Sequence, residues 1–401
     1  MKIRTRADQN RTCLVNRVFR DLMLPILREE LSTSLIFKSP GRFEQLVHPK
    51  SSFLAHIRYF VLEKPSAGCE TAGSQQNMLL SFIAALPTNQ LRYFQSEVEL
   101  TKEVFESVLS AQASLQSIDV VLTVDMADSA LLKPCLTKVK AVKVQIPSDP
   151  AKTGDAWRHY DALIHHAPQL SNLEMISAYD DDGFPDFEHV TLRSRDGSMK
   201  RLHLNRLFLE EMRLGDYFTN ITDHIEVTQL VRLTMTDCRR IRPLLSELTT
   251  CYKANTPAMR NLQLYLPSDQ SERSDISRQD IEELLLSFSG LRTLCLSLWS
   301  DQLVSRASVI NHASTLEAFS VGTFEHKSMR YSVTDLMAIL DACTNLKQLG
   351  VQLGLQKIGP LEGLRRGIIR HRTPVSISEH VETEVEATLV RLCCSPSVQA
   401  V

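Results

Sequence analysis

The six residues Met259-Arg-Asn-Leu262-Gln-Leu264 place apolar side chains at the first, fourth and sixth positions of a short pattern. The same spacing returns at Leu230-Val-Arg-Leu233-Thr-Met235 and at Leu291-Arg-Thr-Leu294-Cys-Leu296. The alternation at the end of each instance is typical of a short strand with one buried face. We therefore predict a strand at each of these places.

Working outward from these three, the pattern recurs along most of the chain at intervals of 24 to 34 residues. The other instances start at Ile57, Leu91, Leu115, Val139, Leu173, Met199, Leu316 and Leu346. Segments that fit helices lie between instances, at Met78–Leu86, Lys102–Ala113, Trp157–His166, Ile281–Phe288 and Val333–Ala342. A strand and a helix at this period indicate a leucine-rich repeat, because one unit cannot bury its own apolar edge and stacked units share a core.

The remaining positions of the pattern provide a test of the strand assignment. The third, fifth and seventh positions, which should point away from the core, amount to 33 residues over eleven instances. The apolar residues among them are Val61, Val121, Ala141, Met175, Cys295 and Ala318, whereas the fourth and sixth positions contain one polar residue, Ser96. This contrast favours true strands over chance matches in a leucine-rich chain.

Polar side chains at the outward positions form the predicted partner-binding surface. The residues selected are Tyr93, Lys143, Tyr179, Arg201, His203, Asn205, Arg232, Asn261, Gln263 and Tyr265. Arg201, His203 and Arg232 are expected to make the middle of the repeat array locally basic, while tyrosine adds large contact area at low entropic cost. The alternative for each residue is an ordinary solvated strand position.

Composition argues against several functional classes. With 45 basic and 47 acidic residues the formal net charge is −2, so no basic field indicates nucleic-acid binding. No apolar run reaches the roughly 18 residues of a membrane span, and the basic N-terminus has no apolar segment behind it. We expect a cytoplasmic or nuclear protein that is a monomer and binds neither nucleic acid nor membrane.

No motif in the chain indicates catalysis. Walker A, Rossmann, nucleophile-elbow and zinc-protease patterns do not occur in the sequence. The nine cysteines are scattered without a C-x-x-C pair, so we predict no zinc site and no disulfide framework. The acidic run 180–188 lacks the ligand spacing of a calcium loop. We predict a non-enzyme with no cofactor and no metal, and hold an enzyme on an α/β fold as the least favoured class.

The segment Leu14-Val-Asn-Arg-Val-Phe-Arg-Asp-Leu-Met-Leu-Pro25-Ile-Leu27 resembles the closing helix of a fungal F-box. With the repeats behind it, most of the chain resembles a fungal F-box/leucine-rich-repeat protein. The resemblance implies that the F-box docks on the Skp adaptor of a cullin-type ubiquitin ligase and that the repeats capture the substrate. The adaptor-binding residues that it implies are Val15, Val18, Phe19, Leu22 and Pro25.

The family's opening, a Leu-Pro-x-Glu-Leu-like helix start, does not precede Leu14. We therefore expect this chain to bind the adaptor weakly or not at all. Without the resemblance, Leu14–Pro25 predicts an amphipathic helix that caps the first repeat.

The sequence thus predicts an α/β leucine-rich-repeat solenoid, an irregular horseshoe with a short N-terminal helical F-box remnant. Residues 1–30 form the remnant, 31–354 the degenerate repeats, and 355–401 a C-terminal cap or partly disordered tail. The predicted function is non-catalytic protein recognition, as the substrate-binding subunit of a ubiquitin ligase. The alternative is a repeat scaffold with no ligase link.

Overall fold

The structure is a computed structural model. The chain divides into two compact units. Unit 1 comprises Met1–Ala178 with Leu192–Gly197, and unit 2 comprises Tyr179–Thr191 with Ser198–Val401. The residues that the structure describes are 29–33, 40–48, 51, 53–64, 72–122, 132–146, 163–164, 166–177, 201–212, 214, 221–266, 277–298, 303–323, 331–351, 376–383 and 386–393.

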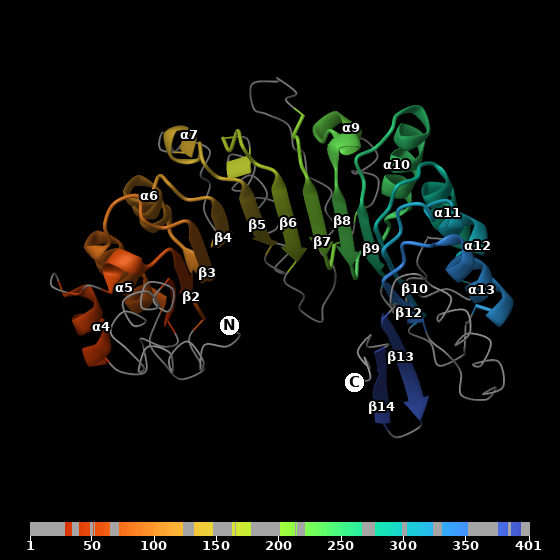
Figure 1. Ribbon diagram of the computed structural model, residues 1–401. Coiled ribbons are helices and arrows are strands. Elements are labelled where there is room, and N and C mark those ends of the chain that lie inside the picture. The colour runs from red at the N-terminus through yellow and green to blue at the C-terminus, as the bar shows by residue number, and fades with distance from the viewer. Residues whose placement is uncertain are drawn as a thin grey trace, which may run out of the picture. The chain divides into compact units, whose positions relative to one another are not determined.

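In unit 1, strands β1 to β6 pair in chain order and every pairing is parallel. Helices join successive strands and lie along one side of them (Figure 1). The elements are β1 (Glu30–Ser32), α4 (Pro40–Val47), η1 (Leu54–His56), β2 (Tyr59–Leu62), α5 (Ala72–Ala85), β3 (Tyr93–Leu100), α6 (Lys102–Ala111), β4 (Ser117–Leu122), α7 (Leu132–Cys135), β5 (Ala141–Ile146) and β6 (Asn172–Ser177).

In unit 2, strands β7 to β13 also pair in chain order and in parallel. Helices α10 to α13 cover one side of this sheet (Figure 1). The elements are β7 (Arg206–Glu210), α9 (Ile221–His224), η3 (Val227–Gln229), β8 (Arg232–Thr236), α10 (Arg242–Ala254), β9 (Asn261–Tyr265), α11 (Arg278–Leu286), β10 (Thr293–Leu298), α12 (Arg306–Ile310), β11 (Ala318–Thr323), α13 (Val333–Ala342), β12 (Gln348–Val351), β13 (Ser376–Thr383) and β14 (Glu386–Cys393).

A series of backbone hydrogen bonds shows that successive repeats share the same geometry. The carbonyl oxygen of the second pattern residue in one repeat accepts two hydrogen bonds, from the backbone N–H groups of the second and third pattern residues in the next repeat, at 2.7–3.1 Å. Arg58 O accepts from Arg92 and Tyr93 in unit 1, and Arg260 O accepts from Arg292 and Thr293 in unit 2. The prediction of an α/β repeat architecture with parallel strands is confirmed.

The pattern residues form the core between strands and helices. Leu262, Leu294 and Phe319 stand side by side in register on β9, β10 and β11, and each is at most 1% exposed. Hydroxyl caps begin four of the described helices, α6, α11, α12 and α13, as at Thr101, whose Oγ1 accepts from the Val104 N–H, and at Ser277, which forms a capping box with Asp280. The strand–helix alternation follows from period-2 burial in the strands and capped amphipathic helices between them.

Two of the predicted strand frames are wrong. In β6, Leu173 and Met175 stand opposite Val142 and Val144 of β5. The pattern therefore starts at Leu170, and the buried Met175 belongs to the core rather than to the outward face. β7 pairs through Leu207 and Leu209, so the pattern starts at Leu204. In both places two overlapping frames satisfy the spacing, and pairing with the neighbouring strand selects one of them.

At both ends of the strand series the structure has strands that the repeat pattern did not include. β1 forms an additional strand beside β2, and Glu29 O accepts from the backbone N–H groups of Arg58 and Tyr59. Backbone pairing characteristic of the repeats therefore includes residues 29 and 30, which belong to the segment 1–30 assigned to the F-box remnant. At the other end, β13 continues the parallel pairing and β14 turns back antiparallel after two residues, as a hairpin does.

Candidate interaction surface

The strand surface of unit 2 carries the outward pattern positions in rows that cross the strands. Arg206 stands beside Arg232, and Arg232 stands beside Asn261, in the row at the third position. The row at the fifth position contains Phe208, Thr234, Gln263, Cys295, Ser320 and Gly350. Side chains from separate repeats are thus brought onto one continuous face.

Four of the predicted partner-binding residues lie on this face. Arg232, Asn261, Gln263 and Tyr265 are all half-buried. The hydroxyl of Thr234 donates to Gln263 Oε1 at 3.2 Å, which ties β8 to β9 and fixes the amide of Gln263. Burial raises the pKa of the Tyr265 hydroxyl, and the neighbouring Cys295 adds to the rise.

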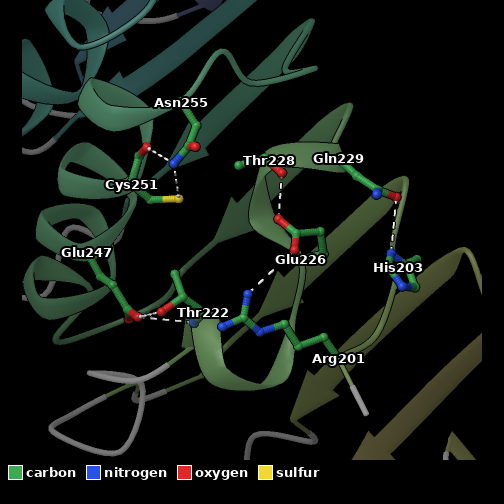
Figure 2. Close-up of polar contacts among 9 residues, drawn as sticks. All are labelled: Arg201, His203, Thr222, Glu226, Thr228, Gln229, Glu247, Cys251 and Asn255. Atoms are coloured by element: carbon green, nitrogen blue, oxygen red, sulfur yellow. Dashed lines mark hydrogen bonds and ion pairs between the residues drawn. The ribbon is translucent and has the colours of Figure 1, made fainter. Parts of the chain in front are cut away.

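Arg201, His203 and Asn205 do not belong to this face, which corrects the sequence prediction. They precede β7 because the pattern starts at Leu204 rather than Met199. Figure 2 shows Arg201 and His203 directed at the segment that leads into β8. The guanidinium of Arg201 lies 3.6 Å from a carboxylate oxygen of Glu226, and His203 Nδ1 lies 3.2 Å from Gln229 Oε1.

The contacts of Arg201 are those of a surface ion pair within the repeat framework. Glu226 accepts a hydrogen bond from the Thr228 hydroxyl at 2.5 Å, and this bond, ahead of the charge of Arg201, lowers the pKa of the Glu226 carboxyl. The backbone of Leu202 pairs with Ile225. The arginine that does stand beside Arg232 is Arg206, which the alternative frame Leu204-Asn-Arg-Leu207-Phe-Leu209 would have identified.

The strand surface of unit 1 holds the predicted residues Tyr93 and Lys143. The rings of Tyr59 and Tyr93 lie 6.0 Å apart, and the Tyr93 hydroxyl donates to Gln95 Oε1 at 2.8 Å. Asp119 is buried, and its carboxylate accepts from Lys143 Nζ at 3.2 Å and from the Gln145 amide at 2.8 Å. Burial, followed by the charge of Asp119, raises the pKa of Tyr93 to about 12.

Carboxylates dominate the exposed part of this unit 1 face. Glu30 registers with Tyr59, and Glu174 registers with Lys143 through β5 and β6. Both are exposed, as are Glu97 and Glu99 on β3. Sequence reasoning missed Glu30 because β1 was not predicted, and it misplaced Glu174 because the β6 frame was shifted.

A second polar surface of unit 1 lies where its strands begin, and sequence reasoning did not identify it. A groove there is lined by Arg58, Thr88, Asn89, Gln90, Arg92, Ser114, Gln116 and Lys138. Three of these side chains are cationic and none is acidic, so the charge at this edge is opposite to that on the strand face of the same unit.

The remaining predicted site residues lie outside the described part of the chain. These are Tyr179 and the adaptor-binding set Val15, Val18, Phe19, Leu22 and Pro25. Within the described residues, no group of three or more histidine, cysteine, aspartate or glutamate side chains is placed to hold a metal ion. No helix among those same residues is both long and apolar enough to cross a membrane.

Comparisons with known proteins give this chain no family. No family model matches it, and no curated protein matches it. A crystal structure of a protein from Bacteroides fragilis, a target of the Northeast Structural Genomics Consortium, is among the solved structures that resemble it. The two are 12% identical over 63% of this chain and 68% of that chain, with a TM-score of 0.38, a value too low to support any argument.

Proposed function

We propose that this protein is a non-catalytic recognition module of the leucine-rich-repeat type, which binds a partner protein on its strand faces. The observation that supports the proposal most directly is the register of the outward rows, which gathers polar and aromatic side chains from successive repeats onto one side of each sheet. Tyrosine and arginine within such rows are residue types enriched in protein interfaces.

A site-specific crosslinking experiment tests this assignment. A photoreactive amino acid at Gln95 in unit 1, or at Gln263 in unit 2, is expected to capture the partner from native extract. The same probe at Leu286 is the matched control, because Leu286 is 53% exposed on helix α11 and lies away from the strand face. Capture from Leu286 but from neither strand position would place the partner on the helices and contradict the proposal.

A role as a ubiquitin-ligase substrate receptor is a second candidate. It rests on the F-box resemblance of Leu14–Leu27 and on the repeats that follow that segment in the sequence. The alternative remains a repeat scaffold with no ligase link, and it needs no adaptor.

Co-purification separates these two candidates. We expect the Skp adaptor to co-purify weakly or not at all with the 401-residue chain, because the resemblance covers only the closing helix of the motif. A stable complex that Phe19→Ala weakens, while Tyr59→Ala on the strand face leaves it intact, would contradict this expectation. Such a result would instead support the substrate-receptor role.

A further inference from the structure

We propose that Arg206 and Arg232 form an anion-recognition site on the strand face of unit 2, and that its ligand is a carboxylate-rich segment of a partner protein. The inference deepens the proposed function and rests on it, because it names the chemistry of the partner for one part of the strand face.

The site begins with the placement of two like charges side by side. Arg206 on β7 and Arg232 on β8 are direct partners in a parallel register, and both occupy the third pattern position. Neighbouring strands lie about 4.8 Å apart, so the two side chains leave the same face close together. Both guanidinium groups are charged at any physiological pH, and like charges placed opposite each other on a sheet repel.

No carboxylate neutralises this pair within the described residues. Arg232 Nε is buried and has no hydrogen-bond partner, although Arg232 as a whole is half-buried and reaches the surface. Other arginines of unit 2 do form ion pairs, for example Arg278 with Glu282 at 2.5 Å and Arg242 with Asp280 at 3.2 Å. A buried donor that lacks a partner is costly, so the packing around Arg232 does not compensate its charge.

The rows around the pair offer donors and no competing acid. Across β7 to β12, the third and fifth positions contain no aspartate or glutamate. The acid on β7, Glu210, occupies the seventh position, two rows from the arginines. Asn261 lies beside Arg232, and Gln263 on the same face accepts from Thr234 through its amide oxygen, so that oxygen is engaged within the face.

These features favour carboxylate side chains over nucleic acid as the ligand. Paired guanidinium groups match the planar geometry of carboxylates, to which arginine donates two parallel hydrogen bonds. Nucleic-acid surfaces use many cations along a track, whereas this face offers two arginines flanked by neutral amides, hydroxyls and the half-buried ring of Phe208. The ligand is therefore an acidic stretch of protein that lies across the strands.

The test uses the full chain and a defined probe. Binding of fluorescein-labelled deca-glutamate is measured by fluorescence anisotropy at about 50 mM salt, where charge attraction is only partly screened. The double variant Arg206→Gln, Arg232→Gln is expected to weaken binding at least about tenfold, because both anchoring charges are lost. The matched control, Lys253→Gln with Arg292→Gln, removes two exposed charges of the same unit from a helix and a strand-start edge, and should change binding by less than about twofold.

Four outcomes would overturn the inference. Equal weakening by both double variants would show attraction by net charge rather than by a site. Tighter binding of a phosphoserine peptide than of deca-glutamate would assign the site to phosphate. A large fall in the melting temperature of Arg232→Gln would give this arginine a structural role, whereas removal of a repelling charge should leave the melting temperature unchanged or raise it. If the probe fails while crosslinking from Gln263 still captures a partner, the inference fails and the proposed function stands.

Discussion

Replacing Leu294 with alanine is expected to lower the free energy of unfolding by about 2–5 kcal/mol. Leu294 is 0% exposed, and its neighbours in register are Leu262 on β9 and Phe319 on β11. Truncation therefore opens a cavity between three consecutive repeats that rigid neighbouring strands cannot close. Urea denaturation followed by far-ultraviolet circular dichroism measures the change.

Thr293→Ala is the matched control for this experiment. Thr293 precedes Leu294 on β10 and occupies an outward position, where it is half-buried. Substitution at such a position is expected to change the free energy of unfolding by about 0.5 kcal/mol or less. Comparable losses at the two positions would contradict the strand register, because a slip of one residue exchanges the faces of the whole strand.

The strands of unit 2 were predictable where only one alignment of the repeat pattern fits the sequence. Five patterns of this kind form the predicted strands β8 to β12, and they start at Leu230, Met259, Leu291, Leu316 and Leu346. Helix Val333–Ala342 also has the predicted bounds, because a serine cap precedes it and one apolar stripe runs through it. Local pattern and packing agree at these places, so local reasoning is sufficient.

The candidate surface was less predictable, because a shift of frame changes which side chains face outward. Around Met199–Leu209 two overlapping frames fit the spacing, and only pairing with Leu233 and Met235 on β8 selects the second. The basic cluster predicted from Arg201, His203 and Arg232 was therefore wrong, and Arg206 takes its place beside Arg232. Strand register depends on the neighbouring strand, which a single repeat does not reveal.

Buried polar side chains that join successive repeats were not predictable from the pattern. Gln112 is 0% exposed, and its Oε1 accepts the backbone N–H groups of Gln90 and Leu91 at 2.7 and 2.8 Å. His312 is equally buried, and its Nδ1 accepts from the backbone N–H of Leu291 at 3.4 Å. Leu91 and Leu291 are both first residues of the pattern. Two different residue types thus satisfy the same backbone group in different repeats.

Gln112 and His312 accept equivalent backbone N–H groups, so glutamine should be able to replace His312. We predict that His312→Gln will lose less stability than the unmodified chain when the pH is lowered. Burial lowers the pKa of His312 to about 4, because desolvation penalises the protonated ring more than the backbone hydrogen bond with Leu285 favours it. In the unfolded chain the pKa of histidine is about 6.5. The unfolded state therefore binds a proton first as the pH falls, and stability is lost between about pH 6.5 and pH 4.

Each pH unit within this window costs about 1.4 kcal/mol, so His312 should account for about 2 kcal/mol of lost stability between pH 7 and pH 5. Glutamine keeps an acceptor for the Leu291 N–H and does not titrate. Between pH 7 and pH 5 the free energy of unfolding should therefore fall by about 2 kcal/mol less for His312→Gln than for the unmodified chain.

Urea denaturation at pH 7, 6 and 5 measures this relative gain, which does not depend on how stable the glutamine variant is at neutral pH. His203→Gln is the control, since it makes the same substitution at an exposed histidine of the same unit. Parallel profiles for His312→Gln and the unmodified chain would mean that His312 is not held neutral by its burial. Protonated imidazole has an N–H on each nitrogen, so in that case His312 would not accept the Leu291 N–H in the folded chain at low pH.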